Sequence, residues 1–176
     1  MAILTRGMGF TSRATPRSLE AWTMRTARAW ATPSAIRRAA NPVAATPEVL
    51  HEAMEHWADH CALCHDNNGS GRTARVKGFY PPAPDMRTAP TQAMTDGELF
   101  YVIEHGIPLT GMPAWGNGTP DGEQQSWALV RFIRHLPSLT EAEIAHMETL
   151  NPKSAGQSEQ DRKIEDFLKG KGGGSN

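Results

Sequence analysis

Apolar residues in the middle of the chain recur at the spacing of a helix. On one predicted face lie Leu50, Ala53, Met54 and Trp57. Thr46 is a suitable N-cap for this helix, and Pro47 suits its first position. One further turn along the same face reaches Cys61. We therefore expect a helix that carries its apolar face up to the first cysteine of the chain.

A second, shorter helix is predicted after Thr95. Its apolar face consists of Leu99, Val102 and Ile103. Gly106 follows the last of these residues and is the expected C-terminal stop. The stretches on either side, residues 66–94 and 107–118, are rich in Gly and Pro, so we expect long loops there.

Two more helices are predicted in the last third of the chain. The strongest helical pattern comprises Leu129, Phe132, Ile133 and Leu136. Asp121 is expected to open this helix and Pro137 to close it. The last helix fits residues 140–150, where Thr140 and Glu143 can form a capping box. Because no convincing strand or internal repeat accompanies these patterns, the fold is predicted to be all-α.

Charge divides the chain into regions of different character. Residues 1–47 hold seven Arg against Glu20 alone, a net charge of +6. Residues 48–150 hold six basic and fourteen acidic side chains, a net charge of −8, and the remainder carries +1. Together with the helix pattern, this predicts a basic arm over 1–47, a folded domain over 48–137, and a C-terminal helix with a polar, flexible tail over 138–176.

The basic N-terminal arm interleaves aromatic and charged residues. Trp22 and Trp30 alternate with Arg25 and Arg28. We expect a helical segment that lies on an anionic membrane surface or on a partner, or that packs against the acidic domain of its own chain. No stretch approaches the roughly 20 apolar residues that span a bilayer. The apolar stretch of an export signal is also missing after the first arginines.

Cys61, Cys64 and His65 form the sequence C-x-x-C-H, the pattern of covalent haem attachment. Two thiols three residues apart on a helical turn can reach both vinyl groups at one porphyrin edge and form thioethers. The imidazole that follows is then aimed at the iron from the same side. We therefore predict haem c as the cofactor, bound through Cys61 and Cys64, with His65 as the proximal iron ligand.

Two other interpretations of the cysteine pair are weaker. The chain has two cysteines, too few for a disulfide scaffold or a four-thiolate metal site. A zinc site could recruit His56, His60 or His65, but it lacks a second clustered pair of ligands. A thioredoxin-like dithiol would be accompanied by a βαβ pattern, which the sequence does not show.

Met112 is the predicted second iron ligand. It lies in the sequence T-G-M-P at residues 110–113, where Gly and Pro hold the loop in a shape that can press a thioether onto iron. Met ligation raises the reduction potential of a haem relative to two histidines. The alternatives are Met86, Met94 and Met147, or bis-histidine ligation through His105 or His135. Most methionines are packing residues, and a His near a helix end is commonly solvated.

Together these motifs resemble a class I, monohaem bacterial cytochrome c. The resemblance is carried by H-C-A-L-C-H at 60–65, T-D-G-E-L-F at 95–100, the loop at 110–113 and the helix at 127–136. It covers residues 46–137. The resemblance implies a compact all-α fold in which the first and last helices of the domain cross beside a covalently bound haem.

The resemblance also implies which residues meet at that crossing. Family members carry a small residue there and an aromatic four positions later. Ala53 and Trp57 stand at these places, with Ala replacing the commoner Gly, so the crossing should be slightly wider. Phe132 or Trp127 would supply the packing from the last helix.

Two finer roles follow from the same resemblance. A proline carbonyl, that of Pro81 or Pro82, would accept a hydrogen bond from Nδ1 of the proximal imidazole and fix its tautomer. Trp115 would donate its indole N–H to a haem propionate, or would cover the haem edge.

With both axial positions of the iron filled, no site remains for a substrate, so we expect an electron-transfer protein and not an enzyme. It would act as a periplasmic carrier or as the haem subunit of a redox complex, and its acidic domain suggests partners with a basic docking patch. The alternative is a haem enzyme or gas sensor in which Met112 is displaced. No nucleic-acid partner is expected.

Location is predicted from the chemistry of attachment. Haem is normally joined to C-x-x-C-H outside the bacterial cytoplasm. We therefore expect a periplasm-facing, membrane-associated protein whose native gene encodes an apolar segment before residue 1.

Overall fold

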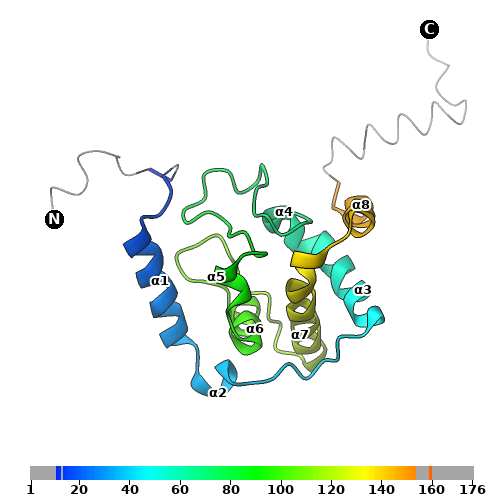
Figure 1. Ribbon diagram of the computed structural model, residues 1–176, viewed down its shortest axis with the longest axis horizontal. Coiled ribbons are helices and arrows are strands. Elements are labelled where there is room, and N and C mark those ends of the chain that lie inside the picture. The colour runs from blue at the N-terminus through cyan, green and yellow to red at the C-terminus, as the bar shows by residue number, and fades with distance from the viewer. Residues whose placement is uncertain (1–10, 13, 154–158, 160–176) are drawn as a thin grey trace, which may run out of the picture.

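The computed structural model describes residues 11–12, 14–153 and 159, and every regular element in these ranges is a helix (Figure 1). The elements are α1 (Ser18–Ala31), α2 (Ser34–Arg37), α3 (Pro47–His56), η1 (Trp57–Cys61), α4 (Ala62–His65), α5 (Ala89–Gln92), α6 (Asp96–His105), α7 (Pro120–His135), η2 (Leu136–Ser138) and α8 (Glu141–Leu150). The predicted all-α fold is confirmed. No described helix combines the length and hydropathy that a bilayer-spanning segment needs. Most of the predicted tail after Asn151 lies outside the described residues.

Helix α3 begins as the sequence predicts. Thr46 caps it, because its hydroxyl accepts a hydrogen bond from the Val49 N–H at 3.3 Å, and Pro47 fills the first position. The helix continues into the π-helical turn η1, in which the Ala62 N–H bonds to the Trp57 carbonyl five residues back. This wide turn lies directly before the cysteine motif.

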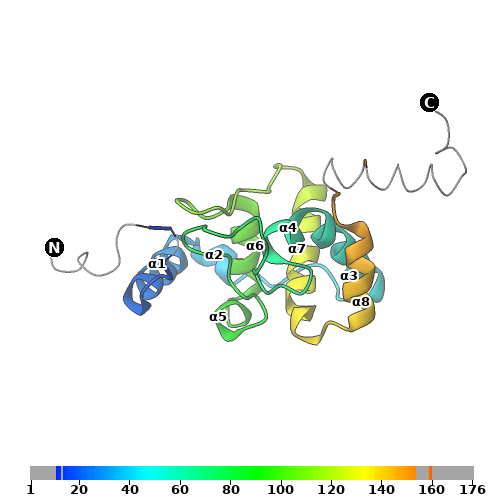
Figure 2. The ribbon, with the colours of Figure 1, turned by 90° about the horizontal axis from the view of Figure 1, so that it is seen from above.

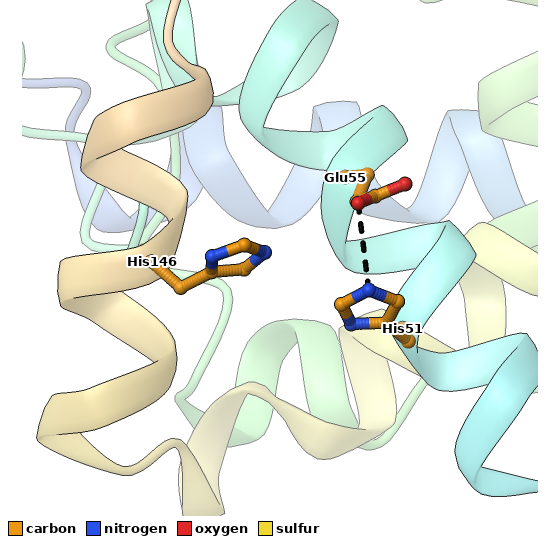
Figure 3. A group of neighbouring side chains, drawn as sticks. All are labelled: His51, Glu55 and His146. Carbon is orange, nitrogen blue, oxygen red and sulfur yellow. Dashed lines mark ion pairs between the residues drawn. The ribbon is translucent and has the colours of Figure 1, made fainter.

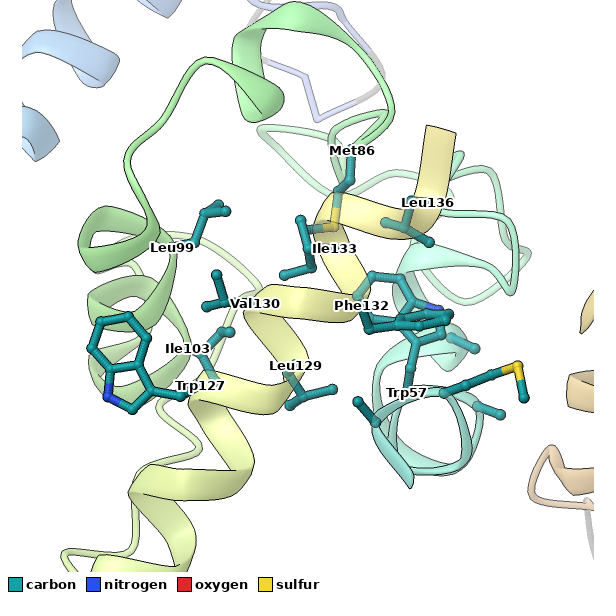
Figure 4. Packing of buried hydrophobic residues seen from close by; sticks show 14 of the residues in the cluster. Trp57, Met86, Leu99, Ile103, Trp127, Leu129, Val130, Phe132, Ile133 and Leu136 are labelled. Carbon is teal, nitrogen blue, oxygen red and sulfur yellow. The ribbon is translucent and has the colours of Figure 1, made fainter. Parts of the chain in front are cut away.

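Helices α3 and α7 pack against each other, and an aromatic pair fills the contact (Figure 4). The ring of Trp57 lies 5.5 Å from that of Phe132, and both side chains are almost completely buried. Trp127 instead stacks on Phe100 of α6, with ring centroids 4.1 Å apart. Of the two aromatic residues predicted for the crossing, Phe132 therefore occupies it, and Ala53 is buried in the same hydrophobic cluster.

The start of α7 differs from the prediction. Thr119, not Asp121, caps the helix by accepting a hydrogen bond from the Gly122 N–H at 3.1 Å, and Asp121 lies in the first turn. The Thr hydroxyl is followed by Pro120 at the first helical position, which Pro favours. The other end is as predicted, since the α-helix stops at His135, two residues before Pro137, which lies in the 3-10 turn η2.

Short helix α5 interrupts the stretch 66–94, which was predicted to be a loop throughout. Its four residues include Pro90 in the first turn, a position that Pro favours. Helix α6 follows and has the predicted ends. Thr95 and Glu98 form a reciprocal capping box, and Gly106 ends the helix with φ +66°.

Helix α8 covers the outer side of α3 and η1 (Figure 2). Its predicted capping box is present between Thr140 and Glu143. Met147 anchors the helix with a fully buried side chain. Just after the helix, the side-chain amides of Asn151 and Asn67 pair with each other, with the Asn151 amide oriented so that its hydrogen bonds are satisfied. The Asn151 nitrogen donates to the Asn67 Oδ1 at 2.9 Å, and the Asn151 oxygen accepts from the Asn67 Nδ2 at 3.0 Å.

The segment between α2 and α3 runs along the domain and is tied to it by hydrogen bonds between side chains and backbone carbonyls. The Asn41 amide donates to the Trp127 carbonyl at 2.9 Å, and the Arg131 guanidinium donates to the Val43 carbonyl at 2.8 Å. Helix α2 packs on α6 at Gly97, where a Cβ would collide with the carbonyl oxygen of Ile36. This part of the predicted arm is therefore in contact with the domain.

Helix α1 touches the domain through polar side chains. The Arg28 guanidinium lies 3.5 Å from the Met94 sulfur, and the Tyr80 hydroxyl donates to Glu20 at 2.5 Å. Burial lowers the pKa of Arg28, although Glu98 opposes this effect. Exposed on the helix are Leu19, Trp22, Met24 and Trp30. The helix thus presents aromatic side chains to its surroundings while its polar groups hold it to the domain.

We expect Phe132→Ala to lower the free energy of unfolding by about 3–5 kcal/mol, because it removes a fully buried ring from the helix crossing. Denaturant unfolding of the purified protein measures this loss. The matched control is Gln125→Ala, an exposed position on the same helix, which should stay within about 0.5 kcal/mol of the parent. Equal losses in both variants would contradict the assigned packing.

Candidate functional site

The cysteine motif lies where the long first helix of the domain ends. Cys61 is the last residue of η1, and Cys64 and His65 close α4. Both cysteines are half-buried and carry free thiols. Burial, with a smaller contribution from Cys64, raises the pKa of the Cys61 thiol to about 12.

A tight turn after the motif fixes the position of His65. Asp66 adopts a left-handed conformation with φ +67°, and its carboxylate accepts hydrogen bonds from the Asn67 N–H and the Ser70 hydroxyl. The Asp66 carbonyl accepts the indole N–H of Trp57 at 3.1 Å. Because Trp57 also packs in the helix crossing, the end of the motif is tied to the most buried part of the domain.

The imidazole of His65 is the most informative group of the site. Its Nδ1 is buried and, in the part of the chain that the structure describes, has no hydrogen-bond partner. The ring lies 5.8 Å from that of Trp57. Burial lowers the pKa of His65, which favours the neutral imidazole, the form that binds metals. The iron ligand would be the other ring nitrogen, Nε2, because Nδ1 is the atom expected to donate to a backbone carbonyl.

The structure contains no hydrogen bond from His65 to Pro81 or Pro82. Both prolines are exposed and lie in the loop between α4 and α5. The role predicted for Pro81 therefore stays a prediction.

Met112 lies near the apex of a loop that leaves and rejoins α6. Its backbone N–H donates to the Thr110 hydroxyl at 3.1 Å, and its carbonyl accepts from the Ile107 N–H at 3.0 Å. The end of the loop is held against α6, because the Trp115 N–H donates to the Ile103 carbonyl at 3.0 Å. Backbone bonds thus hold Met112, whose side chain is half-buried, as the Gly- and Pro-containing sequence predicts.

Glycine is required where this loop begins. Gly106 has φ +66°, and a Cβ there would lie 2.7 Å from the Met112 carbonyl oxygen. Both the backbone conformation and the close approach therefore exclude a larger residue.

Two aromatic contacts bring the Met112 loop toward the cysteine motif. The ring of Trp115 lies 5.7 Å from that of His60, the residue before Cys61, in an edge-on arrangement. The ring of Phe79, from the loop after the motif, packs so closely on Gly111 that a Cβ there would collide with it. The structure therefore gathers the motif, the loop after it and the Met112 loop on one side of the domain.

The other residues considered as iron ligands are engaged elsewhere. Met86 and Met147 are buried in the core, and Met94 lies against Arg28. His135 bonds to Glu143 at 2.8 Å, and His105 packs on Tyr101. These contacts favour Met112 over the alternatives.

The zinc and dithiol interpretations gain no support from the geometry. Among the described residues, the two cysteines do not join His56, His60 or His65 in a group close enough to share one ion. A thiol with a raised pKa is also a poor nucleophile, whereas redox-active dithiols have lowered pKa values.

Asp66 and Phe79 are residues of the site that sequence reasoning missed. Asp66 combines φ +67° with ψ +155°, outside the left-handed helical region that Asp commonly adopts, so the sequence carried no usable signal for it. Nothing in the sequence pairs Phe79 with Gly111, because the two lie in separate loops.

The site fits a covalently attached haem. Two free thiols stand three residues apart at a helix end, and burial lowers the pKa of the half-buried imidazole that follows them, which favours the neutral form that binds iron. Large apolar side chains are exposed on the three surrounding segments, namely Leu63, Phe79, Tyr80, Leu109 and Trp115. A flat apolar cofactor would cover such side chains.

Residues 48–133 match the family model described as Cytochrome C oxidase, cbb3-type, subunit III. The matched segment includes the cysteine motif, Met112 and the crossing of α3 with α7, and it excludes α1, α2 and α8. Comparison with curated proteins gave no match. The match supports a cytochrome c domain at residues 48–133, and a domain of this kind implies haem c as the covalently bound cofactor and a role in electron transport.

We expect Asp66→Ala to lower the free energy of unfolding by about 1–3 kcal/mol, because it leaves the buried Ser70 hydroxyl without its acceptor. Denaturant unfolding measures the change. Asp59→Ala is the matched control, since Asp59 is exposed and pairs with His60 at the surface, and it should cost less than about 1 kcal/mol. An equal cost at both positions would argue against the turn as the anchor of His65.

Proposed function

We propose that the chain transfers single electrons through one haem c, attached at Cys61 and Cys64 and ligated by His65 and Met112. The observation that carries this proposal is the approach of the backbone-held Met112 loop to the cysteine motif, through Trp115 on His60 and Phe79 on Gly111. A loop built in this way supports a second protein ligand opposite His65.

When bound, haem c supplies an iron that alternates between the ferric and ferrous states. His65 would hold one axial position, with its orientation set by the turn at Asp66 and by the ring of Trp57. Met112 would hold the other, on a loop whose shape is fixed by its own backbone bonds. With both positions filled by rigidly placed side chains, no site is left for a substrate, which favours electron transfer over catalysis on bound molecules.

We further propose that the protein serves a redox complex on the periplasm-facing side of a membrane, as a carrier or as a haem subunit. The family description, which names a subunit of an oxidase, supports this role. The net charge of −8 over residues 48–150 would attract a partner with a basic patch, mainly by raising the rate of encounter. The exposed Trp22 and Trp30 of α1 would add apolar contacts to such a complex.

The first test is covalent haem attachment. After expression with the bacterial haem-attachment machinery, we expect haem to remain on the chain in a denaturing gel, with the pyridine haemochrome spectrum of a haem bearing two thioethers. The double variant Cys61→Ala, Cys64→Ala should lose the stain, because both bonds to the porphyrin are removed. Met24→Ala, an exposed position on α1, is the control and should keep it. A parent protein without retained haem would refute the proposal.

The second test concerns the axial ligand. Met112→Ala should abolish the weak charge-transfer band that Met ligation gives to ferric haem at the red end of the spectrum, and should lower the reduction potential. Met24→Ala should change neither property. If the band persists in Met112→Ala, another residue is the ligand. If the reduced parent protein rapidly binds carbon monoxide at neutral pH, a haem enzyme or gas sensor becomes the better assignment.

A further inference from the structure

Three side chains outside the haem-binding region converge between α3 and α8 (Figure 3). His51 and Glu55 stand one turn apart on α3, and His146 reaches toward them from α8. The convergence joins two helices that are far apart in the sequence. It therefore depends on the docking of α8.

The three groups are close enough to share an ion. The His51 Nε2 lies 3.4 Å from the Glu55 Oε1, and the two imidazole rings stack with centroids 5.5 Å apart. One ligand atom of each residue lies within 4.8 Å of the others. In a tetrahedral zinc site with bonds of about 2.0–2.1 Å, ligand atoms stand roughly 3.4 Å apart. Small side-chain rotations would close this difference, and the three exposed residues are free to make them.

We propose that His51, Glu55 and His146 form a surface site for Zn²⁺, with water in the fourth position. Two imidazoles and one carboxylate are the donor set that zinc shares with other borderline divalent metals, whereas Mg²⁺ and Ca²⁺ prefer oxygen alone.

An ion pair between His51 and Glu55 does not by itself explain why the His146 ring lies against this pair. An exposed pair at i, i+4 stabilises a helix only weakly. It also places a positive charge on His51, directly against the stacked ring of His146. A metal ion lets both imidazoles stay neutral and gives each ring a ligand role.

The proposed site is separate from the haem site and does not rest on the proposed function. His51 precedes Cys61 by ten residues, which is about 15 Å along a helix. His146 also lies beyond the segment that matches the cytochrome family model. A bound ion would fasten α8 to α3, reinforcing the anchor provided by Met147.

The test is Zn²⁺ binding by the full chain, measured by isothermal titration on protein purified without a polyhistidine tag. Haem-loaded protein is used, because its thioethers remove the two thiols as competing ligands. If haem does not attach, chain alkylated at both cysteines replaces it, so failure of the haem proposal leaves this test intact. We expect one zinc per chain. His51→Gln, Glu55→Gln and His146→Gln should each weaken binding at least about tenfold.

Glu52→Gln and Glu148→Gln are the matched controls, since each removes an exposed carboxylate from the same helix without touching the site. They should leave one equivalent of zinc bound with little change in affinity. Zn²⁺ should also slow amide hydrogen exchange in α8 of the parent protein and not in His146→Gln. Absence of saturable zinc binding, or equal affinity in the parent and the three site variants, would overturn the proposal.

Discussion

The geometry of the domain depends on the contacts of one side chain, that of Trp57. Its ring packs on Phe132 where α3 crosses α7, and its indole N–H holds the Asp66 carbonyl just beyond the cysteine motif. A side chain that is 2% exposed can keep its one polar atom only if that atom has a partner, and Asp66 provides it. The helix crossing and the placement of His65 are therefore set by the same residue, and neither can shift without the other.

Local signals in the sequence predicted much of this structure. The caps at Thr46, Thr95 and Thr140 and the stop at Gly106 depend on side chains within a few residues of the helix ends, so they could be recognised directly. Where two caps competed, at Thr119 and Asp121, the sequence prediction chose wrongly because either residue is an acceptable N-cap. The positions of the cysteine motif and of Met112 likewise followed from their immediate neighbours.

Contacts between distant segments could not be predicted in this way. The packing of Phe79 on Gly111, of Trp115 on His60 and of His146 on His51 each joins elements whose relative placement is known only after the chain has folded. The choice of Phe132 over Trp127 at the crossing is of the same kind, since both residues lie on apolar faces of one helix. The segment from α2 to α3 gave no periodic signal, yet it is held to α7 by the Asn41 amide on the Trp127 carbonyl and by Arg131 on the Val43 carbonyl.

The wide turn η1 makes the number of residues before Cys61 as important as their identity. A π-helical turn holds about one residue more than an α-helical turn, and an α-helix advances about 100° per residue. Winding η1 into a regular α-helix without removing a residue would therefore swing the cysteines and His65 to another side of the helix axis, away from the Met112 loop, while the core face of α3 stayed in place. The extra residue in η1 and the orientation of the cysteine motif therefore depend on each other, so the turn can change its side chains more easily than its length.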